Sequence, residues 1–255
     1  MIGEGQGVGS TPDLSVVIVT YNAAELIVGC LDSLREDAEA AELSLEVFVV
    51  DSASRDDTTE VIRSHHPWVR LIASEKNLGF SAGNNEALPK CTGRFVALLN
   101  PDSVIRSGAL ERLLGVLGAD DSIGAVGPKL ILADGSTQLE SARNLPTLGN
   151  MWPWLALLDK LRHAALDRGV RTPVDHPPPP PKTLDGFNLL WWERDRSCDA
   201  SCLSGACMVM RREVVDRIGL LDEASPLYLD DMDYCKRIRD AGWRLRYVAE
   251  AEVTH

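Results

Sequence analysis

Polar side chains follow three apolar segments of this 255-residue chain. Asp51 comes directly after residues 47–50, and the triplet Asn100-Pro101-Asp102 comes directly after residues 95–99. A carboxylate in such a position can accept hydrogen bonds from a ribose or a base imide. In a stiff turn it also suits a divalent cation, which prefers oxygen ligands and keeps substrate phosphates in its shell. Each cluster also has a structural explanation, since Asp favours helix N-caps and Asn-Pro-Asp favours turns.

Two further clusters lie in the first half of the chain. Thr20-Tyr21-Asn22 follows the apolar residues 14–19, and Asn77-Leu78-Gly79 precedes a stretch that contains Gly83 and Asn84. Glycine lets a backbone approach a ligand closely, and the amides at the start of a following helix can bind phosphate. An ordinary turn explains the second cluster nearly as well.

The acidic run at residues 230–233, Asp-Asp-Met-Asp, opens a segment with helical periodicity. Its acids suit the positive end of the helix dipole, which is a purely structural role. Three carboxylates in four residues also repel one another, which raises the pKa of one of them towards the range of a general base. We expect Asp231 at the helix end rather than along its buried side. His255, after a last strand, is either structural or a metal ligand.

The segments around these clusters predict an α/β fold. Short apolar strands alternate with helical patterns, which implies a mostly parallel sheet with helices on both faces. Ligands of such sheets bind beyond the carboxyl ends of the strands, where the polar clusters fall. The predicted strands are 14–19, 47–50, 69–73, 95–99, 124–132, 206–210 and 245–248, and the predicted helices begin near 26, 58, 82 and 231.

Composition excludes some classes of protein. The 26 basic and 38 acidic residues give a net charge of -12, which argues against nucleic-acid binding. A phosphorylated substrate would then need a metal or backbone amides. There is no apolar run of about eighteen residues, as a membrane span requires. The glycine-rich residues 1–13 predict a flexible N-terminus without the features of a signal peptide, so we expect a cytoplasmic protein.

The six cysteines are interpreted as reduced thiols, since no export signal is present. Three of them, Cys198, Cys202 and Cys207, lie close together in the sequence. Metal ligation by this cluster is an alternative, although it lacks the tight paired spacing of zinc sites.

Residues 140–200 are predicted to be an insert within a single domain at 14–255. The insert contains five successive prolines at 177–181 and a segment with Trp152 and Trp154, several leucines and nearby basic residues. The tryptophan segment fits an interfacial helix, which would bring the protein into peripheral contact with the inner face of the membrane. Packing on the core, or on a second copy in a homo-oligomer, explains it at least as well.

Taken together, the motifs resemble those of the family 2 glycosyltransferases, which have the GT-A fold. Each motif alone is weak, but together and in register they are highly specific, and the resemblance covers about residues 14–134 and 203–255. The matched segments are Thr20-Tyr21-Asn22, residues 50–56, residues 77–80 with Gly83 and Asn84, Asn100-Pro101-Asp102, residues 204–206 with Met208 and Arg211, Asp222-Glu223, residues 228–233, residues 241–243 and His255.

The resemblance implies roles for the matching positions. Asp102 would ligate Mg²⁺ or Mn²⁺ at the donor diphosphate, with His255 assisting, and Asp231 would be the general base. The acceptor site would be lined by Ser204, Gly205, Ala206 and Asp230. The nucleotide-diphosphate sugar would be bound by Thr20, Tyr21, Asn22, Asp51, Ser54, Asn77, Gly79, Asn84, Asn100 and Asp102.

The chain departs from the family at two motifs. The metal motif commonly has two aspartates, whereas this chain has Asn100 and Asp102, and the usual Glu-Asp pair is Asp230-Asp231. The asparagine form resembles the branch that contains rhamnosyltransferases. It implies dTDP-L-rhamnose as donor and a hydroxyl of a glycan or lipid-linked acceptor. One base and one displacement imply inversion at the anomeric carbon.

Two other classes stay open at this point. A sugar nucleotidyltransferase has a similar sheet, but it needs a glycine-rich basic loop near the first strand, where this chain has no lysine. A non-catalytic nucleotide-sugar binding protein would keep Asp51 but would not need Asp102 and Asp231 together. Hydride transfer is disfavoured because no G-x-G-x-x-G motif follows a strand.

Overall fold

The computed structural model describes residues 11–145, 194–224 and 229–255. Most of the predicted flexible N-terminus lies outside these ranges, as do Tyr228 and the centre of the predicted insert with Trp152 and Trp154. Among the helices of these three ranges, none combines the length and the apolar character that crossing a bilayer requires.

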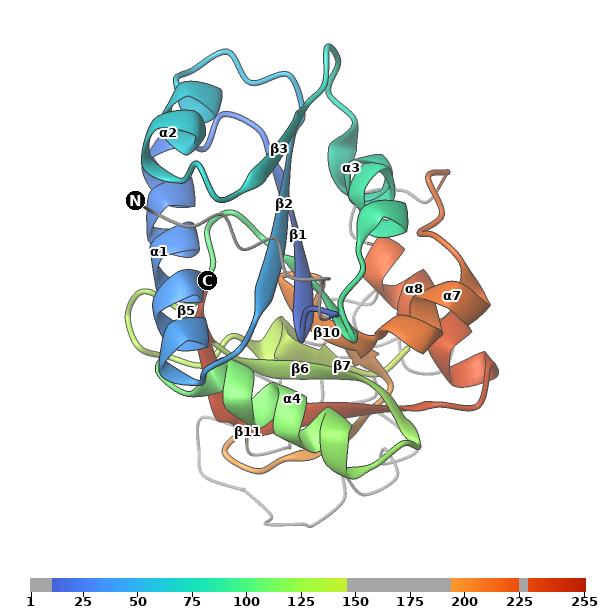
Figure 1. Cartoon of the computed structure of the whole chain (residues 1–255). Helices are drawn as coiled ribbons and strands as arrows, with labels where there is room; N and C mark the ends of the chain where they lie inside the picture. The colour runs from blue at the N-terminus through green and yellow to red at the C-terminus, as the bar shows by residue number, and fades with distance from the viewer. Residues whose placement is uncertain (1–10, 146–193, 225–228) are drawn as a thin grey trace, which may run out of the picture.

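A nine-stranded mixed sheet forms the centre of the molecule (Figure 1). Its order is β3-β2-β1-β4-β10-β6-β11-β5, and β8 pairs with β11. The strands of this sheet are β1 (Leu14–Thr20), β2 (Leu45–Asp51), β3 (Arg70–Ala73), β4 (Phe95–Leu99), β5 (Val104–Ile105), β6 (Ile123–Ile131), β8 (Cys198–Ala200), β10 (Cys207–Arg211) and β11 (Arg244–Thr254). A separate short ladder joins β7 (Ala142–Arg143) to β9 (Cys202–Leu203).

Helices cover both faces of this sheet, and the residues of each strand alternate between the two faces. Val16 and Ile18 of β1 pack in the cluster with α1 (Ala24–Ala40), α2 (Thr58–His65) and α4 (Ala109–Ala119). Val17 packs in the other cluster. The helices of this second cluster are α3 (Gly79–Ala87), α7 (Arg212–Ile218) and α8 (Asp230–Asp240). The chain also forms two short 3₁₀ turns, η1 (Leu88–Lys90) and η2 (Leu139–Ser141). The predicted α/β class with helices on both faces is therefore confirmed.

The direction of β10 decides which loops meet. β1, β2, β3 and β4 run parallel, with Thr20 opposite Asp51, whereas β10 runs antiparallel to both β4 and β6. The start of β10 therefore lies at the same edge of the sheet as the end of β4, and Asn100 N donates to Ala206 O at 2.9 Å. β11 runs parallel to β6, so its end at His255 reaches this edge as well.

The helix α4 was not predicted, although Leu110, Leu113, Leu114 and Leu117 carry a helical spacing and are buried. The described ends of the predicted insert also form strands, since β7 and β8 pair with β9 and β11. All six cysteines are buried and free. Cys198, Cys202 and Cys207 lie in three different strands, and no group of three His, Cys, Asp or Glu side chains in the described ranges is placed to hold a metal.

Candidate active site

Hydrogen bonds join the loops that follow β1 and β2. Asn22 N donates to Ser54 Oγ at 2.8 Å, and Arg55 N donates to Asn22 Oδ1 at 2.8 Å. Asn22 and Ala53 adopt positive φ angles of 51° and 61°, a conformation that few non-glycine residues take. Such a conformation persists where its surroundings fix it, so the two loops form one preshaped edge.

Asp51 lies at the base of these loops. It is 2% exposed, and its carboxylate accepts hydrogen bonds from both the backbone N and the hydroxyl of Ser54. It does not cap the next helix, because the residue before α2 is Asp57. Tyr21 is 45% exposed beside it, and the buried hydroxyl of Thr20 meets no hydrogen-bond partner in the described residues. The nucleotide-binding roles of these residues stay predictions.

The loop before α3 shapes the next part of the edge. Asn77 Oδ1 accepts from Gly79 N at 2.9 Å, and Gly79 has a φ of 71°, which suits glycine. Asn84 is buried and donates to Phe80 O at 2.9 Å, so its side chain is engaged within the helix. A Cβ on Gly83 would lie 2.6 Å from Val19, so α3 sits tightly on β1.

Asn100 and Asp102 lie in a tight turn after β4. Ser103 N donates to Asn100 O at 3.2 Å across the turn, with Pro101 at its second position. The triplet can therefore form a turn and still bind a ligand, because the turn leaves the Asp102 side chain 42% exposed.

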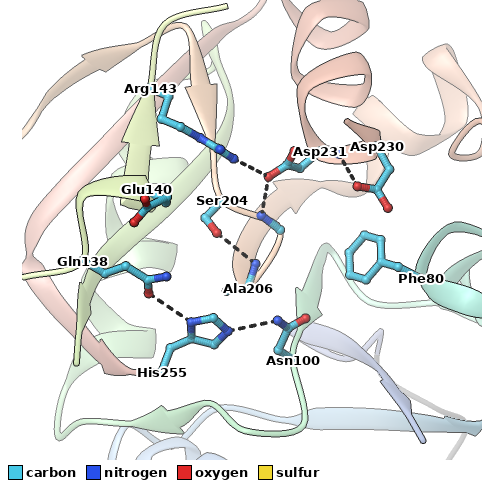
Figure 2. A pocket seen from close by; sticks show the side chains of 11 residues that line it. Phe80, Asn100, Gln138, Glu140, Arg143, Ser204, Ala206, Asp230, Asp231 and His255 are labelled. Atoms are coloured by element: carbon cyan, nitrogen blue, oxygen red, sulfur yellow. Dashed lines mark hydrogen bonds and ion pairs between the residues drawn. The ribbon is translucent and has the colours of Figure 1, made fainter. Parts of the chain in front are cut away.

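A chain of hydrogen bonds fixes the His255 ring. Asn100 Nδ2 lies 3.0 Å from His255 Nε2, and His255 Nδ1 lies 3.0 Å from Gln138 Oε1 (Figure 2). With Asn100 placed so that its NH₂ donates, Nε2 must carry the lone pair and Nδ1 the proton. Asp102 Oδ1 lies 3.5 Å from the same Nε2.

This arrangement fits a divalent cation. Metal–oxygen and metal–imidazole bonds of about 2.0–2.2 Å let two ligand atoms of one ion lie as far apart as Asp102 Oδ1 and His255 Nε2 do. A proton on Nδ1 leaves the lone pair on Nε2, which would ligate a cation in place of accepting from Asn100, and Gln138 would be the outer partner that holds the ring. Two protein ligands leave the other positions to diphosphate oxygens and water, as Mg²⁺ sites on phosphates commonly do.

A pocket of about 370 Å³ lies between this turn and α8. Figure 2 shows Arg143 and Asp231 at one end, and His255 and Asn100 at the other, with Ser204 and Ala206 between them. All four predicted acceptor residues line it. The lining residues are Phe80, Asn100, Gln138, Glu140, Arg143, Ser204, Gly205, Ala206, Asp230, Asp231 and His255.

Asp231 lies in the first turn of α8, at the helix end as predicted, but it is buried, with 9% exposure, which was not expected. The β9–β10 turn and Arg143 cover it. Arg143 Nη2 donates to Asp231 Oδ2 at 3.0 Å, and Gly205 N donates to the same oxygen at 3.3 Å.

The pKa of Asp231 is raised above its ordinary value, chiefly because burial disfavours the charged form. Arg143 and the Gly205 amide act in the opposite direction, and Asp230 adds a smaller upward effect. The sequence predicted a raised pKa from repulsion between neighbouring carboxylates, whereas the largest cause is burial. Asp233 is not among the causes of this shift, and its carboxylate pairs with Arg237 at 2.7 Å.

Gly205 allows the two sides of the pocket to approach. A Cβ there would lie 3.1 Å from Phe80 Cζ and 3.4 Å from Asp231 Cβ. The starts of α3 and α8 also meet, since Ser81 Oγ lies 3.4 Å from Asp230 Oδ2. Phe80 thereby links the loop after β3 to the pocket.

Sequence reasoning gave no role to four lining residues, namely Phe80, Gln138, Glu140 and Arg143. The last three lie at or just before the start of the predicted insert, in a segment without a recognisable motif. Phe80 was part of a matched motif, and its aromatic type next to a helix start was the available signal.

The fold and these loops define a glycosyltransferase of the GT-A type. A structure of the mannosyltransferase PcManGT from Pyrobaculum calidifontis with GDP-Man and Mn²⁺ matches 96% of this chain and 57% of its own, with a TM-score of 0.62 and 21% identity. A structure of GalNAc-T7 with UDP, GalNAc and Mn²⁺ matches 96% of this chain and 44% of its own, with a TM-score of 0.65 and 14% identity.

The chain belongs to the glycosyltransferase-like family 2, whose model matches residues 12–255. The N-acetylglucosaminyl-diphospho-decaprenol L-rhamnosyltransferase of Mycobacterium tuberculosis is 28% identical, over 96% of this chain and 76% of its own length. The pre-mycofactocin glycosyltransferase of the same organism is 28% identical, over 95% of this chain and 42% of its own length. The predicted family and the GT-A fold are confirmed.

Proposed function

We propose that this chain transfers L-rhamnose from dTDP-L-rhamnose to a hydroxyl of a lipid-linked or polymeric glycan, with inversion at the anomeric carbon. The observation that carries the mechanism is the pocket with the buried Asp231 at one end and Asn100 and His255, next to Asp102, at the other. A general base and a diphosphate-binding group must lie on opposite sides of the reacting carbon in a single displacement. The two ends of the pocket provide that separation.

The donor would lie along the carboxyl edge of the sheet. Tyr21 is exposed for stacking on the base, and Asp51, at the end of β2, would bind a ribose hydroxyl. The diphosphate would reach Asp102 and His255, which would hold Mg²⁺ or Mn²⁺. A bound cation would neutralise the charge that develops on the leaving diphosphate. Mn²⁺ is present in the two structures with the same fold.

The acceptor would enter the pocket between Phe80 and the turn at residues 204–206. Asp231 takes the proton of the acceptor hydroxyl, and that oxygen attacks the anomeric carbon. The bond between the anomeric carbon and the diphosphate oxygen breaks on the opposite face, and the nucleotide diphosphate leaves. One displacement inverts the anomeric configuration.

The donor and acceptor classes draw on the M. tuberculosis relative, whose name gives an L-rhamnosyl group and a decaprenol-linked acceptor. A lipid-linked acceptor would require the protein to work at the inner face of the membrane, as a peripheral protein. The tryptophan segment proposed for that contact lies outside the described residues.

A donor screen tests this proposal. Purified protein with Mn²⁺ is given dTDP-L-rhamnose, UDP-hexoses or GDP-mannose, with an N-acetylglucosaminyl-diphospho-polyprenol acceptor, and nucleotide diphosphate release is measured. Release from dTDP-L-rhamnose, with an inverted linkage by NMR, is the expected result. Turnover with a UDP-hexose and none with the rhamnose donor would reject the donor, and full activity in a chelator would reject the metal.

A further inference from the structure

The two oxygens of Asp231 have different environments. Oδ2 accepts from Arg143 Nη2 at 3.0 Å and from Gly205 N at 3.3 Å. Oδ1 is buried and meets no hydrogen-bond donor in the ranges that the structure describes. The carboxylate is therefore anchored through one oxygen, Oδ2, by two donors from outside its own helix.

Arg143 and Asp231 belong to different parts of the chain. It belongs to β7, where it pairs with Cys202 of β9, and its side chain is 14% exposed. The β7–β9 ladder leads directly into the turn at Ser204 and Gly205. One small unit therefore supplies both groups that bind Oδ2.

We propose that Arg143 is a positioning residue for the transfer reaction, which holds Asp231 Oδ2 and so fixes the orientation of the carboxylate that takes the acceptor proton. This inference rests on the proposed role of Asp231 as the base. It adds a residue outside every motif of the sequence.

Arg143 has a second effect, on the charge of the base. Burial favours the protonated form of Asp231, which cannot accept a proton, and Arg143 opposes it. The charged groups that face Asp231 are Arg143 from β7 and Asp230 from its own helix, with Cys202 of β9 nearby. Glu140 and His255 line the same pocket. Removal of Arg143 therefore raises the pKa of Asp231 further, and the acidic limb of the rate profile moves to higher pH.

Arginine and lysine at this position should differ. The planar guanidinium can hold an oxygen in a fixed direction, whereas an ammonium group is a point charge on a flexible stem. Arg143→Lys keeps the charge and should leave the acidic limb near its wild-type position. It loses the fixed direction, so kcat should still fall.

The test compares Arg143→Met and Arg143→Lys with Arg239→Met, which removes an exposed arginine from the same helix as Asp231. We measure kcat and both KM values from pH 5 to 9, dTDP binding by calorimetry and thermal unfolding. Arg143→Met should lower kcat roughly 10- to 100-fold, the effect of one charge-assisted hydrogen bond, and move the acidic limb upward. Donor KM and dTDP binding should be unchanged, and Arg239→Met should match wild type.

A double-mutant cycle separates this inference from the proposed function. Arg143→Met added to Asp231→Asn should cause no further loss, because the base that Arg143 orients is absent. Wild-type turnover in Asp231→Asn would reject the base itself. An inactive Asp231→Asn with a wild-type kcat and pH profile in Arg143→Met would reject only the positioning role. If Arg143→Met does not fold, Arg143→Lys decides, and a wild-type kcat there overturns the inference.

Discussion

The site has a donor half, formed by the loops after β1 and β2, and an acceptor half, formed by the pocket beside α8. The two halves are built from contacts between residues at different separations in the sequence. The loops after β1 and β2 join residues 32 or 33 positions apart, within one strand–helix–strand unit. Around the pocket, where the donor diphosphate and the acceptor would meet, Arg143 contacts Asp231 over 88 positions, Gln138 contacts His255 over 117, and Asn100 contacts His255 over 155. Local units should therefore fix the nucleotide, while the reacting groups depend on how the whole sheet is assembled.

The largest effect is expected where the two halves meet. Asp102→Ala removes the carboxylate next to His255, so transfer should fall by about 10³-fold or more, since metal stabilisation of a leaving group is worth several kcal/mol. Metal-dependent nucleotide binding should weaken as well. Turnover and Mn²⁺-dependent dTDP binding by calorimetry measure both effects.

The turn carboxylate contributes little to the core, so Asp102→Ala should unfold at the wild-type temperature. Asp121→Ala is a matched control, because that side chain is 95% exposed and pairs with Arg211, outside the pocket lining. Equal turnover of Asp102→Ala and wild type would show that the two halves do not share a metal.

The next effect concerns the His255 ring. Gln138→Leu removes the acceptor of the Nδ1 proton, so the ring loses its fixed orientation. Such outer partners typically change metal affinity 10- to 100-fold, and we expect Mn²⁺ binding in the presence of dTDP to weaken by about tenfold. Electron paramagnetic resonance of free Mn²⁺ measures this directly.

Gln138→Glu is the matched control, because it keeps an oxygen at the same place and should retain Mn²⁺ affinity. If leucine and glutamate variants bind Mn²⁺ as the wild type does, His255 is not a ligand whose orientation depends on Gln138.

A smaller effect is expected in the donor half at Tyr21. Stacking of a base on an aromatic ring is worth about 1–3 kcal/mol, so Tyr21→Ala should weaken dTDP binding by about tenfold. Tyr21→Phe keeps the ring and should bind as the wild type does. Since the acceptor half is intact, kcat at saturating donor should not change. A lower kcat in Tyr21→Ala would contradict the separation of the two halves.

The smallest effect is expected in the loops after β1 and β2. Ser54→Ala removes the hydroxyl that accepts from Asn22 N and donates to Asp51. The free energy of unfolding should fall by about 1–2 kcal/mol, and donor affinity by a few-fold. Ser64→Ala, on the exposed side of α2, should be nearly neutral in urea unfolding. Equal stability of both variants would mean that the loops are not held by these bonds.

The same contrast explains what sequence could predict. β1, β2 and β4 and the polar residues after them were found from apolar runs of strand length, because each such unit is encoded locally. Arg143 was not found because its strand, β7, has two residues and no periodicity, and Gln138 was not found because it precedes the three-residue turn η2. The burial of Asp231 was missed since the covering turn at Gly205 comes from a reversed strand.

The central claim is that Asp231 is the base of a transferase whose donor half binds independently. Asp231→Asn keeps the shape of the side chain and removes its basicity. The account predicts wild-type affinity for dTDP and Mn²⁺, with transfer reduced by roughly 10²–10⁴-fold. Near wild-type transfer by Asp231→Asn would contradict the claim, and an inactive Asp230→Asn in the same assay would move the role of base to Asp230.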